Sequence, residues 1–443
     1  MSTTKDTADK KNRLINFAHL SFLIAWSLGI VFLICKQYFL KTLLLSSSPG
    51  TVFINDFLHF YCAGQMVLQG QGPHAYDPQV QMAFMDRLIS PLHVAQVFYI
   101  QYVPFVFLLS VPLALMSTDT AFWCWAVFST FCIGASALLL HKLLPRFSGR
   151  FEPSIIFLGL FATLANFECL QLGQLSNFLL LLLSVYTISL LRPFQFPQQK
   201  RLLDIIGGVC LSISSMKPHY ALLMAVPAFV QKRWLLLAVA AGMELILLAA
   251  SGLVLGWDNI SGYPHIVLEA DANPQYGGVH PEHMVSVRGV LSRFLDDPLA
   301  LKASMLLFLL PAAAILANKR NYSLKQEQLE LLIAFVIILI LVMSPHTNLY
   351  DCVLLVLPAY LLLPGIGIAE IFKSSSALAR TARALIYFYP LFSAIMFVLW
   401  EYVPLVSQNP IPFFIWHLIL LVALAGMNWK ADNKTAALKH PKS

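Results

Sequence analysis

The chain has 443 residues, of which 58% are hydrophobic and 12% are charged, and its formal net charge is +7 at pH 7. Soluble globular proteins carry about 25% charged residues, and a water-soluble fold of this length needs more polar residues to cover its surface. The composition therefore excludes an ordinary soluble protein. The positive charge does not indicate nucleic-acid binding, because the basic residues lie in short clusters beside apolar blocks, as in membrane proteins.

The apolar residues are gathered into blocks that are nearly free of charge. A bilayer core of about 30 Å is crossed by about 20 apolar residues in a helix, so the blocks predict an all-α polytopic membrane protein. The first block exceeds the roughly 7–15 apolar residues of a signal peptide, and we expect it to be a retained span. The blocks are 14–35, 120–140, 154–171, 177–191, 233–255, 302–317, 328–343, 350–372, 384–400 and 411–427.

Clusters of Lys and Arg beside these blocks predict the orientation, because cytoplasmic loops carry an excess of positive charge. By this rule the tails at 1–13 and 429–443 are cytoplasmic, and residues 14–428 form one transmembrane domain in the plasma membrane. Two long loops, at 36–100 and 256–300, then lie outside the cell, and both contain few basic residues for their length.

Two apolar regions are too short to be ordinary spans. The block at 101–117 contains two prolines, and the pair at 203–216 and 219–231 is separated by Lys217-Pro218. We expect a re-entrant element or tilted hairpin in the first region and a broken helix pair in the second. Broken helices at membrane depth usually line an enclosed cavity. The predicted total is about 11 to 13 spans.

Polar residues collect at the expected outer face, and the first outer loop holds the main catalytic candidate. Asp56 stands in the sequence Asn-Asp-Phe-Leu-His-Phe-Tyr, which ends at Tyr61 and includes His59. A carboxylate in apolar surroundings is a stronger base, so Asp56 is a candidate general base. The alternative is that Asp56 caps a helix that starts near residue 57.

Further polar residues have both a binding and a structural interpretation. Tyr76 and Asp77, in a Gly- and Pro-rich turn region, either contact a sugar or shape the loop. Gln174 and Asn177, at an outer helix junction, either bind a sugar hydroxyl or cap the helices. Lys217 and His219, at the helix break, either bind a phosphate or, for the lysine, reach the membrane surface along a helix end.

The second outer loop contains His280 and His283, spaced as H-x-x-H. On a helix this spacing can bind a metal, but Pro281 and the neighbouring glycines favour a loop, and no metal is expected. Arg288 has the planar fork that suits phosphate. The last polar segment, Ser-Pro-His-Thr-Asn-Leu-Tyr-Asp with His346 as its histidine, either binds ligand or begins a capped helix at its asparagine.

The order of the motifs is more specific than any one of them. An outer Asn-Asp-Phe is followed by Ala-Gly…Gly-x-x-x-x-Tyr-Asp-Pro, Tyr-x-Pro, Gly-Gln-x-x-Asn before a leucine-rich span, Lys-Pro in a broken helix pair, and Ser-Pro-His. This series, over residues of roughly 50–350, resembles glycosyltransferase family 87, the polyprenyl-phosphate-mannose-dependent mannosyltransferases and their relatives with the GT-C membrane fold.

The resemblance implies a GT-C-like helical bundle that transfers a sugar, mannose, from a polyprenyl-phosphate donor at the outer leaflet with inversion. It places the essential aspartate at Asp56 and needs no cofactor. The acceptor would be an envelope lipid or glycan, and membrane lipids would surround the bundle. The residues expected to bind the donor phosphate or substrate are Lys217, His219, Arg288, His346, His59, Tyr76, Gln174 and Asn177.

Three other functions remain open at this point. A transporter or lipid flippase would fit the broken helices, but it predicts internal repeats and ionisable residues at mid-membrane, which the sequence does not clearly show. An envelope-glycan ligase or polymerase of another fold would carry its large outer loop late in the chain. A non-catalytic membrane subunit would tolerate replacement of Asp56.

Overall fold

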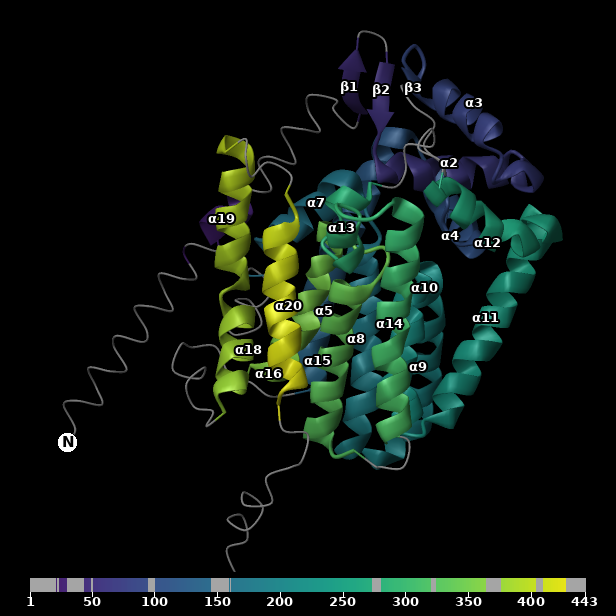
Figure 1. Cartoon of the computed structure of the whole chain (residues 1–443). Coiled ribbons are helices and arrows are strands. Elements are labelled where there is room, and N and C mark those ends of the chain that lie inside the picture. The colour runs from purple at the N-terminus through teal and green to yellow at the C-terminus, as the bar shows by residue number, and fades with distance from the viewer. Residues whose placement is uncertain are drawn as a thin grey trace, which may run out of the picture.

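The computed structural model describes residues 21, 24–29, 44–48, 51–94, 100–144, 159, 161–272, 280–319, 324–363, 376–403 and 409–427. The predicted tails at 1–13 and 429–443, and all but a few residues of the predicted span at 14–35, lie outside this part of the chain. Most described residues belong to helices (Figure 1). The prediction of an all-α polytopic membrane protein is confirmed.

Five described helices are long and apolar enough to cross a membrane, and a pair of helices bent by 51° adds a sixth candidate. The predicted total of 11 to 13 spans stays a prediction, because parts of the chain lie outside the described residues. The five helices are α5 (Thr118–Leu143), α8 (Ser176–Leu191), α11 (Trp234–Leu255), α14 (Asp297–Lys319) and α15 (Gln326–Met343), and the bent pair is α18 (Ala377–Tyr387) and α19 (Tyr389–Tyr402).

Shorter elements complete the bundle. The helices are α7 (Leu164–Leu172), α9 (Lys200–Ile213), α10 (Pro218–Val230), α13 (Val287–Leu291), α16 (Val356–Leu362) and α20 (Ile411–Ala425). The 3-10 turns are η1 (Gly72–His74), η2 (Arg192–Phe194), η3 (Pro197–Gln199), η4 (Ser214–Met216), η5 (Pro281–His283) and η6 (Leu349–Leu355).

Helices α9 and α10 form the broken pair that the sequence predicts around Lys217. Arg233, just after α10, reaches back to the start of α9, where its Nε donates to Asp204 Oδ1 at 2.5 Å. Its Nη2 also donates to the carbonyl of Ser189 at 2.9 Å. The two helices are therefore antiparallel, and the η4 turn and Lys217 lie at the opposite end of the hairpin.

One end of the bundle, here called the α2 end, carries most of the non-spanning elements (Figure 1). Helix α2 lies crosswise to the bundle helices at this end, and a small sheet that the sequence did not predict lies beside it. Strands β1 and β2 pair antiparallel, and β2 and β3 pair parallel. These elements are α2 (Asp56–Leu68), α3 (Pro78–Ile89), α4 (Pro104–Ala114), α12 (Trp257–Ala272), β1 (Leu44–Ser48), β2 (Thr51–Ile54) and β3 (His93–Val94).

The short block at 101–117 supports α2. Its helix α4 has 11 residues, about 16 Å at 1.5 Å per residue, which is too short to cross a bilayer. Gln65 Nε2 donates to the carbonyl of Ala114 at 2.7 Å, and a Cβ atom at Gly64 would lie 2.5 Å from the carbonyl oxygen of Ser110. Only a glycine permits this close approach of α2 to α4.

We therefore predict that Gly64→Ala destabilises the protein by about 1–3 kcal/mol, the usual cost of overpacking, and lowers the Tm of the purified protein. Gly242→Ala is the matched control, because Gly242 is also within a helix but has nothing within 4 Å of the added Cβ. The control should leave the Tm unchanged or slightly raised, since alanine favours helix more than glycine does. Equal Tm values for both variants would contradict the close α2–α4 contact.

Candidate active site

Asp56 is the first residue of α2 and is not its cap. The cap is Asn55, whose Oδ1 accepts a hydrogen bond from the backbone N–H of Leu58 at 3.2 Å, so the capping alternative for Asp56 is wrong by one residue. The Asp56 carboxylate is 29% exposed and accepts a hydrogen bond from Gln174 Nε2 at 2.5 Å. His59 Nδ1 lies 3.7 Å from its other oxygen. The Asp56 carboxylate is thus partly exposed and accessible to a substrate.

The α7–α8 junction brings Gln174 to α2. Gly173 ends α7 in the left-handed conformation, with φ of 70°, and a Cβ there would lie 2.5 Å from Phe57 Cβ. A glycine meets both constraints at no steric cost. Trp125 Nε1 donates to the carbonyl of Gly173 at 2.8 Å. These contacts fix the junction, and with it the amide that holds Asp56.

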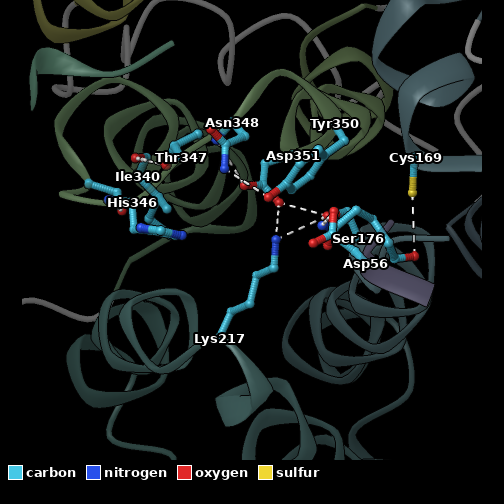
Figure 2. A network of polar contacts seen from close by, with 12 residues as sticks. Asp56, Cys169, Ser176, Lys217, Ile340, His346, Thr347, Asn348, Tyr350 and Asp351 are labelled. Atoms are coloured by element: carbon cyan, nitrogen blue, oxygen red, sulfur yellow. Dashed lines mark hydrogen bonds and ion pairs between the residues drawn. The ribbon is translucent and has the colours of Figure 1, made fainter. Parts of the chain in front are cut away.

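Ser176, two residues after Gln174 in the same junction, contacts a buried ion pair. The Lys217 ammonium is paired with Asp351 Oδ1, and Ser176 Oγ donates to the same oxygen at 2.6 Å. Lys217 Nζ also donates to Ser176 Oγ at 3.2 Å. In Figure 2 the ammonium points at Asp351, with Asp56 and Ser176 to one side and His346 to the other. We call Asp56, Gln174, Ser176, Lys217 and Asp351 the polar cluster.

The segment after α15 holds Asp351 in place. Asn348 caps η6, and its backbone N–H donates to Asp351 Oδ2 at 3.2 Å in a reciprocal capping box. The Asn348 side chain donates to the Tyr350 hydroxyl at 2.7 Å. The sequence alternative of a capped helix start at Asn348 is therefore confirmed, and the cap itself orients a carboxylate of the polar cluster.

Two tyrosines border the polar cluster. The ring of Tyr350 has its centroid 4.8 Å from Lys217 Nζ, within the range of a cation–π contact. Burial raises the pKa of Tyr102 well above its usual value, and the Asp56 and Asp351 carboxylates raise it further. Its phenol therefore stays protonated at neutral pH, as a hydrogen-bond donor beside both carboxylates.

Tyr76 holds the backbone of Tyr102 in place. Its hydroxyl donates to the carbonyl of Tyr102 at 2.6 Å, and its buried ring packs on Phe107 and Tyr263. These contacts favour the loop-shaping interpretation of Tyr76 over direct sugar contact.

His219 and His346, which the sequence analysis names as candidate phosphate ligands, lie near Lys217. Lys217 and His346 are both close enough to His219 to act on it electrostatically. The Nε2 atom of His219 is buried and has no hydrogen-bond partner among the described residues. A buried polar atom usually has a partner, so this nitrogen is suited to a bound ligand.

The structure buries Arg288 and Asn177, which were expected to bind the donor phosphate or the substrate. Arg288 is 1% exposed; its Nη1 donates to the carbonyl of Pro345 at 3.3 Å, and Nη2 lies 3.8 Å from Asp297. It therefore supports the His346 segment and is not open to a phosphate. Asn177 is buried, and its Nδ2 donates to Ser129 and Asn166 at 2.9 and 3.0 Å. It joins α5, α7 and α8 inside the bundle.

Sequence reasoning did not include Ser176, Asp351 and Tyr102 among the site residues, although each belongs to a motif noted there. It also overlooked Glu244, an ionisable residue at the middle of the spanning helix α11. Glu244 accepts hydrogen bonds from Ser212 and Ser215 at 3.0 and 2.9 Å, and so fixes the turn just before Lys217. Ionisable groups at this depth are costly and usually functional, which was the available signal.

Comparison with known families matches residues 99–345, more than half of the chain, to glycosyltransferase family 87. The chain belongs to glycosyltransferase family 87. It is therefore a membrane glycosyltransferase, and the resemblance drawn from the motif order is confirmed. No curated protein matches the chain. The family 87 match includes Gln174, Lys217 and Arg288, whereas Asp56 and His346 lie outside its limits, so their roles depend on the geometry described above.

A double-mutant cycle tests the Lys217–Asp351 pair of the family 87 enzyme. Removing one partner of a buried ion pair costs about 3–5 kcal/mol, because the other charge is left uncompensated. We predict that Lys217→Met and Asp351→Asn each lower the Tm clearly, and that the double variant is more stable than the sum of the two losses implies. Additive losses in thermal unfolding would show that the two side chains do not interact.

Proposed function

We propose that this enzyme transfers a sugar, mannose, from a polyprenyl-phosphate donor to an envelope lipid or glycan on the outer side of the cell membrane, with inversion at the anomeric carbon. The family supplies the reaction class. The main support for the proposal is the α7–α8 junction. There Gln174 binds the Asp56 carboxylate, and Ser176 binds the Lys217 ammonium. A base and a cation are thereby brought together from distant segments.

Asp56 acts as the general base in this proposal. The acceptor hydroxyl oxygen attacks the anomeric carbon while Asp56 takes its proton, and the bond from that carbon to the phosphate oxygen breaks. Polyprenyl phosphate leaves with the bonding electrons. A single displacement of this kind inverts the anomeric centre. Gln174 and His59 orient the carboxylate, and the protonated phenol of Tyr102 supplies a nearby donor for a sugar oxygen.

Lys217 stabilises the charge that develops on the leaving phosphate. Its ammonium has three N–H donors, of which two are directed at Ser176 and Asp351, so one remains for a phosphate oxygen. We assign His219, through its buried Nε2, and His346 as further phosphate ligands that hydrogen-bond the phosphate beside Lys217. Arg288 has a supporting role, since it holds the segment that presents His346.

The polyprenyl chain would lie on apolar helix faces that start beside these ligands. The ring of His219 lies 6.5 Å from that of Phe308 on α14. On the same two helices, α10 exposes Leu222 and α14 exposes Leu306 and Leu310. A hydrocarbon tail packed there keeps its phosphate at the α2 end, which we assign to the outer surface of the membrane.

Asp56→Asn should lower sugar transfer by about 10²–10⁴-fold, the usual contribution of a general base. Purified protein in lipid would be given polyprenyl-phosphate-linked mannose and envelope lipid or glycan acceptors, and the product would be quantified. The KM for the donor should change little, because asparagine keeps the hydrogen bond to Gln174 but does not accept the proton.

Asp77→Asn is the matched control for this experiment. Asp77 belongs to the same region and caps α3, and asparagine caps a helix as well as aspartate does, so this variant should keep full activity. Full activity in Asp56→Asn would overturn the base assignment. Activity with other polyprenyl-phosphate sugars, and none with mannose, would overturn the donor sugar alone.

A further inference from the structure

A second group of ionisable side chains lies in the loop between α12 and α14. His280, Glu282 and His283 each offer one ligand atom, and these atoms all lie within 4.8 Å of one another. His280 Nδ1 lies 3.0 Å and His283 Nε2 lies 3.8 Å from Glu282 Oε1. All three side chains are exposed. None belongs to the polar cluster or to the proposed transfer step.

The backbone explains why these residues converge. Pro281 begins the 3-10 turn η5, in which the N–H of His283 donates to the carbonyl of His280 at 3.0 Å. A 3-10 turn has three residues per turn, so side chains at positions i and i+3 lie above one another. The two histidines therefore lie at the ends of a short 3-10 turn and not on an α-helix, and Pro281 fits there because proline is well tolerated in the first turn of a helix.

Contacts with α13 and with Arg293 hold the η5 turn in place. A Cβ at Gly289 would lie 2.2 Å from the carbonyl oxygen of Met284 and 2.9 Å from that of Pro281, so α13 packs directly against η5. Arg293 Nη2 also donates to the carbonyl of Glu282 at 3.3 Å. The backbone of the turn is held in this way while the three ligand atoms lie within 4.8 Å of one another, and zinc requires bond lengths of about 2.0–2.2 Å to such ligands.

We propose that His280, Glu282 and His283 form a Zn²⁺ site, with water as the fourth ligand. Two imidazoles and one carboxylate are a ligand set that suits zinc, whereas calcium and magnesium prefer oxygen ligands alone. This site goes beyond the proposed transfer reaction and does not depend on it.

The metal would stabilise the loop that supports the polar cluster. The backbone N–H of Val285 donates to the carbonyl of Thr347 at 3.0 Å, and Arg288 donates to that of Pro345. Both contacts join residues that follow the turn, Val285 and, in α13, Arg288, to the segment that carries His346. Zinc bound at η5 would therefore act as a structural clamp on that segment, at a distance from the transfer chemistry itself.

Zinc binding to the full-length protein tests the site. Protein purified without a histidine tag would be stripped with EDTA, dialysed and titrated with Zn²⁺ against a chromogenic chelator, and the bound metal would be counted by mass spectrometry. The wild type should bind one equivalent and gain Tm. Loss of an outer-shell partner already weakens a metal site roughly 10–100-fold, so His283→Ala and His280→Ala should each weaken binding at least tenfold.

His265→Ala is the matched control, because His265 is an exposed histidine that also pairs with a glutamate, Glu269, at 3.7 Å, but has no second histidine beside it in the described residues. This variant should bind zinc like the wild type. Equal affinity in His283→Ala and the wild type, or less than one equivalent bound by the wild type, would overturn the site and leave the three residues as an ion-pair cluster only. No sugar donor is present, so the result is independent of the transferase proposal.

Discussion

The buried contact between Lys217 and Asp351 is the constraint on which the site depends. The two side chains are 11% and 1% exposed, and buried charges are tolerated only when they are paired and hydrogen-bonded. Ser176 Oγ and the backbone N–H of Asn348 meet that requirement, because both donate hydrogen bonds to the Asp351 carboxylate. Since these four residues come from the α7–α8, α9–α10 and α15–η6 junctions, satisfying one ion pair fixes three breaks in the helical bundle relative to one another.

Asp56 is attached to the same constraint. Gln174, which holds its carboxylate, lies two residues before Ser176, and the left-handed Gly173 brings this junction against Phe57. The positions of the candidate base and of the cation are thus coupled through a few residues of backbone. Arg288 and Glu244 act from outside the polar cluster, the first on the segment that carries His346 and the second on the turn before Lys217.

The sequence predicted those features that depend on local composition. Apolar blocks predicted membrane helices, Lys217-Pro218 predicted the break between α9 and α10, and the order of short motifs predicted the family. The Lys217–Asp351 pair was not predictable, because its partners are 134 residues apart and several cations and carboxylates were equally available.

The wrong predictions for Arg288 and Asn177 also concern contacts between segments that are distant in the sequence. Arg288 looked like an accessible phosphate ligand, and Asn177 looked like a ligand at a helix junction, but the packing of the helices buries both. The Asp56 cap was misplaced by one residue because Asn55 and Asp56 are both good caps, and only the backbone geometry decides between them. In each case a side chain's partner depends on tertiary packing that residue type does not specify.

The central claim is that Asp56 and the Lys217–Asp351 pair belong to one active site of this family 87 enzyme. The most direct test is an electron cryomicroscopy structure of the Asp56→Asn variant with a polyprenyl-phosphate sugar donor bound. We expect the donor phosphate to lie within hydrogen-bonding distance of Lys217 Nζ and the anomeric carbon to face residue 56. A phosphate bound away from Lys217, with the sugar remote from α2, would contradict it.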